Sequence, residues 1–386
     1  MSGSPPSADS RGLTPTNRSV RARDADECPL IDRSTNRPID SKEPTVDYKS
    51  SGVDIEAGNT VVRRIKALAR STTTPGVLSD IGSFGGLFTL DPARHDGPVL
   101  VASADGVGTK LRVAFLANRH GTVGEDLVNH CVNDILVQGA SPLFFLDYFA
   151  TGRLSPDVAV AVVEGLARAC RENGCALLGG ETAEMPGFYA EGEYDLAGFI
   201  VGRVERARVI DGRGITAGDV LVGLPSSGLH TNGYSLARSI VFEALGLTVD
   251  SHVPELGATV ADALLEPHRS YLRLVRPLIE RGRIKGMAHI TGGGITDNVP
   301  RALPDGIGAV VRRRAWDVPP LFRFLVGAGG VPAEDAMRTF NMGIGLVLIV
   351  APSDVDATLG ELRAAGEHGA RVIGTTVRGE GIRYEP

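Results

Sequence analysis

Three carboxylates in the first half of the chain, Asp105, Asp134 and Glu181, stand at or near the predicted ends of strands or helices. Asp105 follows a predicted strand over 98–102, and Glu181 follows a short buried strand and two glycines. Asp134 falls on the apolar side of a predicted helix over 122–138, where a carboxylate must be paired or bind a cation. A structural hydrogen bond to a backbone amide explains Asp134 about equally well. As a set, these hard oxygen ligands favour a site for Mg²⁺ and phosphate oxygens.

The loop 105–110, with the sequence DGVGTK, could bind the phosphates themselves. Gly106 and Gly108 allow backbone N–H groups to converge on an anion, and Lys110 would add a positive charge. A tight turn with a surface lysine is the alternative, because Asp-Gly pairs commonly form turns. Taken alone, this loop does not decide between the two interpretations.

Two further glycine-rich stretches could contact a phosphorylated ligand. The first could form a mobile cover over phosphates, although a plain flexible loop is the more frequent meaning of such a stretch; its glycines are Gly82, Gly85 and Gly86. The second precedes a predicted helix, whose N-terminus offers free N–H groups and a favourable dipole; its glycines are Gly292, Gly293 and Gly294.

His230 lies in a polar loop bounded by glycines, SSGLHTNG at 226–233, together with Asn232. A histidine in this setting could act as an acid or base, or donate a hydrogen bond to a substrate. Most loop histidines have no such role, so the surrounding motifs must support the assignment.

The elements that position these residues alternate between strands and helices, which predicts an α/β (α+β) protein. The main predicted strands are 98–102, 143–150, 175–178, 196–204, 219–224 and 342–350, and the main predicted helices are 122–138, 155–174, 234–246, 259–281 and 355–365. Residues 1–44 are rich in polar residues and proline and are predicted to form a disordered tail. A polar, glycine-containing stretch near residue 210 divides the rest into predicted domains 45–210 and 211–386.

The composition excludes several classes of protein. The chain has 386 residues, is 42% hydrophobic and carries a net charge of −6. This balance, without a basic run, argues against nucleic-acid and membrane-surface partners. The chain also lacks an apolar transmembrane run, an N-terminal signal core and a C-x-x-C pair among its four cysteines, so we expect a cytoplasmic protein. Walker A, dinucleotide-fold, G-x-S-x-G and H-E-x-x-H patterns are absent as well.

Several motifs occur in one order along residues 45–386. They are YKSSGVD (48–54), DGVGTK (105–110), VND (132–134), GGETAEMPG (179–187), SSGLHTNG (226–233), TGGG (291–294) and TFNMG (339–343). In this arrangement the chain closely resembles the phosphoribosylformylglycinamidine cyclo-ligases, also called aminoimidazole ribonucleotide synthetases. Ordered motifs over nearly the whole chain are far more specific than any single one.

The resemblance implies an activity and an architecture. Members of this family use ATP to close the imidazole ring of purines, converting formylglycinamidine ribonucleotide to aminoimidazole ribonucleotide, ADP and phosphate. ATP phosphorylates the formyl oxygen, and the ribose-bearing nitrogen then displaces phosphate. The family fold has an N-terminal domain with a mixed sheet that pairs across a homodimer, and a C-terminal α/β domain. ATP and Mg²⁺ are the implied cofactors, and nucleotide binds without a P-loop.

The resemblance also assigns roles to individual residues. It implies a catalytic role for Asp105, Lys110 and His230, and it places Mg²⁺ near Asp105, Asp134 and Glu181. Nucleotide would contact Lys66, Gly82, Gly85, Gly86, Gly106, Gly108 and Asp134, and substrate would contact His230, Asn232, Gly292, Gly293 and Gly294. One departure is that SDIG at 79–82 has fewer glycines than the family pattern, which puts the detailed phosphate contacts of that loop in doubt.

Two other functions remain open. The chain could be another member of the same ATP-binding superfamily, such as a selenophosphate synthetase or a thiamine phosphate kinase-like enzyme. A catalytic cysteine early in the chain would favour the former, but the only cysteine before residue 131 is Cys28 in the tail. The chain could also be a non-catalytic scaffold, which loss of the acidic residues would favour; all three acids are present.

Overall fold

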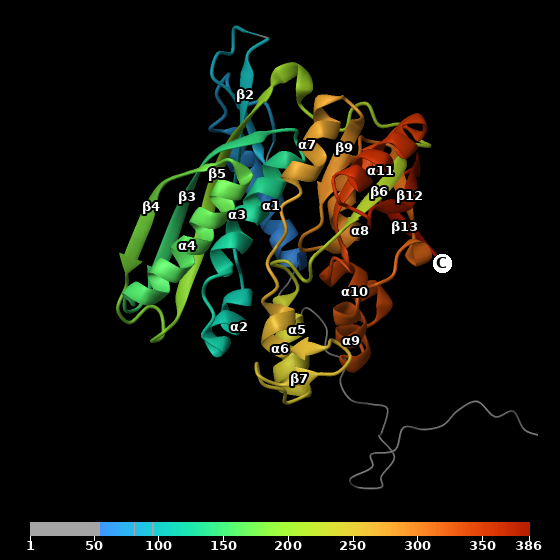
Figure 1. Cartoon of the computed structure of the whole chain (residues 1–386). Coiled ribbons are helices and arrows are strands. Elements are labelled where there is room, and N and C mark those ends of the chain that lie inside the picture. The colour runs from blue at the N-terminus through green and yellow to red at the C-terminus, as the bar shows by residue number, and fades with distance from the viewer. Residues whose placement is uncertain (1–54, 81, 95) are drawn as a thin grey trace, which may run out of the picture. The chain divides into compact units, whose positions relative to one another are not determined.

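The computed structural model describes residues 55–80, 82–94 and 96–386 (Figure 1). The predicted disordered tail at 1–44 and the YKSSGVD motif lie outside the described residues. Among the described residues, no helix has the length and apolar character needed to cross a membrane.

Strands and helices alternate along the described chain, which confirms the predicted α/β class. The helices are α1 (Ile55–Arg70), α2 (Lys110–Ala117), α3 (Val123–Leu136), α4 (Pro156–Asn173), α5 (Tyr234–Arg238), α6 (Val260–Leu264), α7 (Leu272–Glu280), α8 (Gly294–Asn298), α9 (Pro320–Ala328), α10 (Ala333–Thr339) and α11 (Val355–Ala364). The strands are β1 (Gly86–Thr89), β2 (Pro98–Gly106), β3 (Ser141–Thr151), β4 (Ala176–Glu184), β5 (Tyr194–Glu205), β6 (Val220–Pro225), β7 (His252–Val253), β8 (Ala258–Thr259), β9 (Ile284–His289), β10 (Ile307–Arg312), β11 (Ile344–Val350), β12 (Arg371–Arg378) and β13 (Ile382–Glu385).

The first sheet is a five-stranded mixed sheet in the order β1-β2-β5-β3-β4. Helices α3 and α4 pack on one of its faces (Figure 1). Along β5, Leu196 and Ile200 are fully buried, whereas Phe199 between them is 47% exposed. Because successive strand residues point to opposite faces, the helices cover one face and the described chain leaves the other open.

The second sheet is a six-stranded mixed sheet in the order β13-β10-β12-β6-β11-β9. Every residue of β11 is buried, as expected for an unbroken apolar strand between two neighbours. Strand β9 lies at one edge of this sheet and ends at His289, and the predicted glycine run 291–294 follows it. The end of this edge strand therefore brings His289 close in sequence to the glycines at 292–294.

The stretch 259–281 is not one helix, as the sequence predicted, but two short helices, α6 and α7, joined by an extended segment at 265–271. Pro267 within the segment disfavours helix there. Side chains of α3 form hydrogen bonds with the backbone of this segment, as a neighbouring strand would. Asp126 accepts the His268 N–H at 2.7 Å, and Asn129 donates to the His268 carbonyl at 2.7 Å. Polar residues on α3 therefore stabilise a segment more than 130 positions later in the chain.

Candidate active site

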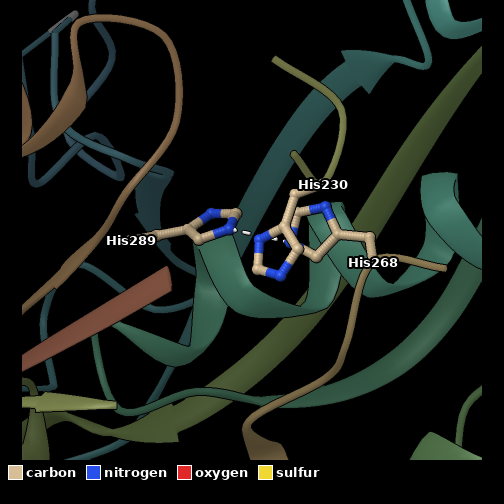
Figure 2. A group of neighbouring side chains, drawn as sticks. All are labelled: His230, His268 and His289. Atoms are coloured by element: carbon tan, nitrogen blue, oxygen red, sulfur yellow. Dashed lines mark hydrogen bonds between the residues drawn. The ribbon is translucent and has the colours of Figure 1, made fainter. Parts of the chain in front are cut away.

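Four histidines gather beside α3, and none of their side chains is more than 4% exposed. His130 belongs to α3 itself, whereas His230, His268 and His289 come from the second half of the chain. Figure 2 shows the latter three, with the Nε2 atoms of His268 and His289 3.1 Å apart. The rings of His230 and His268 are stacked, with centroids 3.9 Å apart and planes inclined by 16°. The cluster therefore joins the helix layer of the first sheet to the second half of the chain.

Asp134 connects this cluster to the first sheet. One of its carboxylate oxygens, Oδ1, lies 2.8 Å from His289 Nδ1, and the other accepts a hydrogen bond from Ser103 of β2 at 3.2 Å. Burial lowers the pKa of His289, and the hydrogen bond to Asp134 opposes that effect. The Asp134 side chain is only 8% exposed, and both of its oxygens have partners within the chain. Asp134 is thus paired within the chain, but its partners are the side chains of His289 and Ser103 rather than the backbone amide that the structural alternative named.

Asp105 forms the second acidic contact of the cluster, and it reaches solvent. Its Oδ2 lies 2.8 Å from His130 Nε2, and its side chain is 40% exposed. Burial on its own would lower the pKa of His130, but Asp105 and Asp134 outweigh it and raise that pKa to about 9. Burial likewise would raise the pKa of Asp105, and the contact with His130 lowers it overall. The two side chains therefore form an ion pair at neutral pH.

The amide of Asn133 fixes proton positions in the cluster. Its Oδ1 accepts a backbone N–H at 3.0 Å and its Nδ2 donates to a backbone carbonyl at 2.9 Å, so the amide has one orientation. Its second Nδ2 proton faces His268 Nε2 at 3.2 Å, which makes that nitrogen an acceptor. His289 Nε2 lies 3.1 Å from the same atom. Because His289 Nδ1 lies 2.8 Å from Asp134 Oδ1, the His289 ring bridges His268 and the Asp134 carboxylate.

Two groups of side chains in the described structure have metal-ligating atoms within 4.8 Å of one another: His230, His268 and His289, and His130, Asp134 and His289. In the first group, N–H donors already use the lone pairs of His268 Nε2 and His230 Nε2, at 3.2 Å each. In the second group, Asp134 and His289 are hydrogen-bonded to each other. An ion in either group would have to replace these bonds, so a hydrogen-bonded network accounts for the contacts better.

Lys110 is fully buried, in contrast to the surface lysine or phosphate contact that the sequence suggested. Its Nζ lies 2.8 Å from Asp126 Oδ1 and donates to the carbonyls of Glu266 at 2.7 Å and His230 at 3.2 Å. Burial lowers the pKa of Lys110 and raises that of Asp126, and in each case the other group opposes the shift. All three N–H donors of the ammonium are used within the chain, which leaves none for a phosphate.

His230 is also fully buried, and its backbone adopts a left-handed conformation with φ 63°. Its Nε2 accepts the Ser227 N–H at 3.2 Å, so the neutral ring carries its proton on Nδ1, which has no partner among the described residues. Burial holds the pKa of His230 well below its usual value. The backbone of Asn232 follows closely, and a Cβ placed on Gly292 would lie 3.3 Å from Asn232 Oδ1. Two of the predicted substrate contacts are therefore neighbours, whereas the His230 ring is fully buried.

The glycine run at 292–294 opens a helix of only five residues, α8. Gly293 and Gly294 have positive φ angles of 95° and 59°. A Cβ on Gly294 would lie 2.0 Å from the Met337 carbonyl oxygen, so close backbone packing requires glycine there. Gly292 is exposed, whereas Gly293 and Gly294 are buried. Only the first glycine of the run faces outward, and a short α8 gives weak support to the helix-dipole argument.

A hollow of about 920 Å³ lies between α1 and the first two strands of the first sheet. Its lining includes Lys66, Gly82, Gly85 and Gly86, which the sequence analysis assigned to a nucleotide, and Ser103. Ser103 also donates to Asp134, so this one side chain connects the hollow to the histidine cluster. The structure thus brings the glycine loop and Lys66 together in one concave place.

Close packing explains one glycine of the hollow. A Cβ on Gly85 would lie 2.8 Å from Gln138 Oε1 and 3.1 Å from the Ala102 carbonyl oxygen. A Cβ on Gly86 would lie 3.8 Å from the same carbonyl oxygen, an ordinary contact. Gly85 is therefore required by packing, whereas Gly86 leaves room for a side chain.

The structure does not bring Glu181 to the other two acids. Across the first sheet, Asp105 aligns with Gly198, and Gly198 with Asp147 of β3, whereas Glu181 aligns with the next residue, Tyr148. This one-residue offset puts Glu181 on the open face and Asp105 on the face covered by α3. Strands β5 and β3 also separate the two, at about 4.8 Å per step. Within one chain, Asp105 and Asp134 approach a common partner and Glu181 does not.

The residues present fit a magnesium ion only in part. Asp105 offers a solvent-facing carboxylate, and the Gly106 N–H, which donates to Asp105 Oδ1 at 2.7 Å, helps to orient it. Asp134 has both oxygens engaged, and Glu181 lies on the other face of the sheet. Mg²⁺ is commonly held by one or two carboxylates together with substrate phosphates and water. One accessible carboxylate meets that requirement only if the substrate supplies further oxygens.

Sequence reasoning missed His130, His268 and His289. A usable signal existed for His130, because it precedes Asp134 by four residues on an apolar helix and must share its face. His268 had no such signal, since the sequence predicted a helix through its position. His289 ends a strand two residues before the TGGG motif, which could have marked it as a neighbour of the glycine run.

Two family models match the chain. The family model for the N-terminal domain of AIR synthase related proteins matches residues 87–204, and the model for the C-terminal domain matches residues 216–385. A phosphoribosylformylglycinamidine cyclo-ligase of Trichlorobacter lovleyi is 58% identical over 325 residues, which cover 84% of this chain and 93% of that protein. One of Geobacter metallireducens is 55% identical over 335 residues, which cover 87% of this chain and 96% of that protein.

Solved structures support the fold. A complex of AaThiL with AMPPCP and TMP has a TM-score of 0.58 at 16% identity, covering 84% of this chain and 92% of that one. Escherichia coli HypE has a TM-score of 0.56 at 20% identity, covering 85% and 94%. At this level of identity the likeness extends to the fold alone, a two-domain arrangement with two mixed sheets.

Proposed function

The chain belongs to the phosphoribosylformylglycinamidine cyclo-ligase family, and we propose that its active site extends from the glycine-lined hollow to the ion pair of Asp105 and His130. The activity is the ATP-dependent conversion of formylglycinamidine ribonucleotide to aminoimidazole ribonucleotide, ADP and phosphate in purine biosynthesis. The observation that carries the activity is an identity of 58% that extends over 93% of a relative with this function. The cytoplasmic location predicted from the sequence suits such an enzyme.

The reaction needs a leaving group and a positioned nucleophile. The γ-phosphoryl group passes from ATP to the formyl oxygen, which turns a poor leaving group into phosphate. The ribose-bearing nitrogen then attacks the formyl carbon, the carbon–oxygen bond to phosphate breaks, and the nitrogen loses a proton. Phosphoryl transfer of this kind depends on positioning and on stabilisation of negative charge more than on covalent participation of the protein.

The hollow between α1 and β2 is the proposed nucleotide site. Lys66 supplies a positive charge at its wall, and a side chain placed on Gly82 would lie 3.7 Å from the Lys66 ammonium. Gly82 itself has a φ of 118°, a conformation that favours glycine. A volume of about 920 Å³ accommodates a nucleoside triphosphate. The glycine backbone and this lysine together replace the missing P-loop.

Asp105 is the proposed protein ligand for Mg²⁺, held in orientation by His130 and by the Gly106 N–H. A bound Mg²⁺ would neutralise negative charge on the triphosphate. Asp134 supports the site indirectly, because its contacts are with Ser103 and His289 rather than with solvent. Asn232 and Gly292 are the proposed substrate contacts at the surface, whereas the His230 ring is fully buried.

A homodimer is proposed from the open face of the first sheet. Phe199 on that face is 47% exposed, and Leu178 on the edge strand β4 is 64% exposed. Exposed apolar side chains on a sheet face and an unpaired edge commonly mark a protein interface. A second copy covering this face would also bury Glu181. Light scattering of Phe199→Asp would show a monomer if this proposal is right; a dimer of unchanged stability would contradict it.

The activity itself is tested with purified protein. Incubation with Mg²⁺, ATP and formylglycinamidine ribonucleotide should yield aminoimidazole ribonucleotide and ADP in equal amounts, and omission of the ribonucleotide should abolish ADP release. Formation of ADP without the aminoimidazole product would contradict the assignment. Thiamine phosphate, the substrate of a thiamine phosphate kinase, serves as the control and should give no ADP.

A further inference from the structure

We propose that Lys110 and Asp126 act together as a buried positioning pair that holds the stacked imidazoles of His230 and His268 in register. The proposal concerns how the cluster is held, and it rests on the proposed function only where it links His230 to turnover. Neither side chain would touch nucleotide or substrate. Both act through the backbone of the residues that they hold.

The contacts of the pair reach both rings of the stack. Lys110 Nζ donates to the carbonyl oxygen of His230 at 3.2 Å, and Asp126 Oδ1 accepts the backbone N–H of His268 at 2.7 Å. The two charged groups lie 2.8 Å apart and both are fully buried. One ion pair therefore holds the peptide group of each stacked histidine, although the two residues lie 38 positions apart in the chain. A displacement of either charge would move one ring relative to the other.

The backbone at His230 needs such support. A positive φ is uncommon for a residue with a side chain and persists where surrounding contacts enforce it. Lys110 holds the carbonyl of this residue, and the Ser227 N–H holds its ring. Lys110 also donates to the Glu266 carbonyl at 2.7 Å, at the beginning of the extended segment that carries His268. The Lys110 ammonium thus holds both the loop that carries His230 and the extended segment that carries His268.

A structural role alone would not call for this arrangement. Replacing a buried ion pair by apolar residues of similar size is often neutral or stabilising, and retention of the pair is better explained where it specifies one geometry. Here the geometry specified is the ring of His230, whose Nδ1 has no partner among the described residues and which precedes Asn232 by two positions in the same loop. Lys110 and Asp126 therefore act on ring orientation, and removal of either charge alone also lowers stability because the other charge is left buried and unpaired.

Three variants test the proposal: Lys110→Met removes the charge, Lys110→Arg keeps it, and Asp126→Asn removes the partner charge. The matched control is Lys285→Met, because Lys285 also pairs with a buried aspartate, Asp219, at 2.8 Å. Lys285 lies at the opposite end of β9 from His289, and among the described residues no hydrogen bond or ion pair joins it to His230 or His268. The readouts are ¹⁵N-histidine NMR, which reports ring tautomers and environments, the kinetic constants for both substrates, and thermal unfolding.

Lys110→Met and Asp126→Asn should shift the ring resonances of His230 and His268 and lower kcat roughly 10- to 100-fold, with the KM for ATP within about twofold. Lys110→Arg should recover part of kcat, and Lys285→Met should leave the histidine resonances and kcat unchanged. Unshifted resonances with wild-type kcat in Lys110→Met would overturn the proposal. If Lys110→Met does not fold, Asp126→Asn and Lys110→Arg decide by the same readouts. Shifted resonances in an enzyme without cyclo-ligase turnover would uphold the positioning pair and contradict the proposed function.

Discussion

The histidine cluster beside α3 and the hollow beside α1 differ in the residues that form them and in how far their polar groups are paired. In the cluster, long polar side chains are buried and nearly all of their polar atoms are paired within the chain. In the hollow, glycines expose backbone and leave space that no side chain of the described residues fills. Ser103 contributes to both regions.

The difference indicates a division of labour. A largely paired network in a low-dielectric setting resists rearrangement, because breaking one bond leaves a further buried polar group unsatisfied. A glycine-lined hollow has few such bonds to lose and can receive a charged ligand. We therefore expect substitutions in the cluster to act mainly on turnover and those in the hollow to act mainly on nucleotide affinity.

Asp105→Asn should have the largest effect, because Asp105 is the accessible carboxylate of the cluster and the partner of His130. We expect kcat/KM to fall by roughly 100- to 1,000-fold, since a charge positioned at a phosphoryl-transfer site is lost. Calorimetric titration with Mg²⁺-ATP should show weaker binding. Glu181→Gln is the control and should change Mg²⁺-ATP binding by less than about threefold if Glu181 stays on the open face. Equal losses in both variants would show that the two acids act at one site.

Gly85→Ala should raise the KM for ATP by about tenfold, because the added Cβ meets Gln138 and the Ala102 carbonyl and must shift the wall of the hollow. Gly86→Ala, with an ordinary contact at 3.8 Å, should change the KM by less than about twofold. Steady-state kinetics with ATP as the varied substrate would measure both. If the two variants behave alike, the loop does not hold the described conformation when nucleotide binds.

The free energy of unfolding should fall as the pH rises toward 9. His130 has its folded pKa raised to about 9 from its usual 6.5, so the stability that it gains from Asp105 and Asp134 is fully present below pH 6.5 and is lost as pH rises through 9. At about 1.4 kcal/mol per pKa unit, the total is on the order of 3 kcal/mol. Denaturant titrations at pH 6, 7.5 and 9 would measure the decline. In His130→Gln the decline over this range should disappear, and its persistence would assign it to other groups.

Ser103→Ala should have the smallest effect. It removes one hydrogen bond to Asp134, a contact worth about 1 kcal/mol, and leaves the other carboxylate oxygen paired with His289. We expect a two- to fivefold loss of kcat with an unchanged KM for ATP. A rise in the KM alone would place Ser103 with the hollow rather than with the cluster.

Local sequence signals predicted those parts that depend on neighbours along the chain. Helix α4 begins at Pro156 and is followed by Gly174 in a left-handed conformation, which agrees with the helix predicted over 155–174, although the Ser155 side chain makes no capping hydrogen bond. The unbroken apolar run of β11 and the clustered glycines likewise could be recognised from the sequence. The order of the motifs identified the family, because the motifs need only the chain itself to be recognised.

Other features depended on partners far along the chain. Lys110 ends a glycine-containing loop that is typical of a phosphate site, but its environment is set by Asp126 and by the carbonyls of His230 and Glu266. Residues 265–271 read as helix, but Pro267 and side chains of α3 favour an extended segment. No local pattern could reveal either outcome, since each depends on which segments pack together.

The sequence by itself determined the α/β class, the family and the positions of the glycines, because periodicity, capping and motif order are properties of short stretches. Only the tertiary structure decided that Asp105 and Asp134 approach the same histidine while Glu181 faces the other way. The physical reason is strand register: side chains alternate with a period of two, so the face on which a carboxylate lies follows from pairing across the sheet and not from its neighbours in sequence.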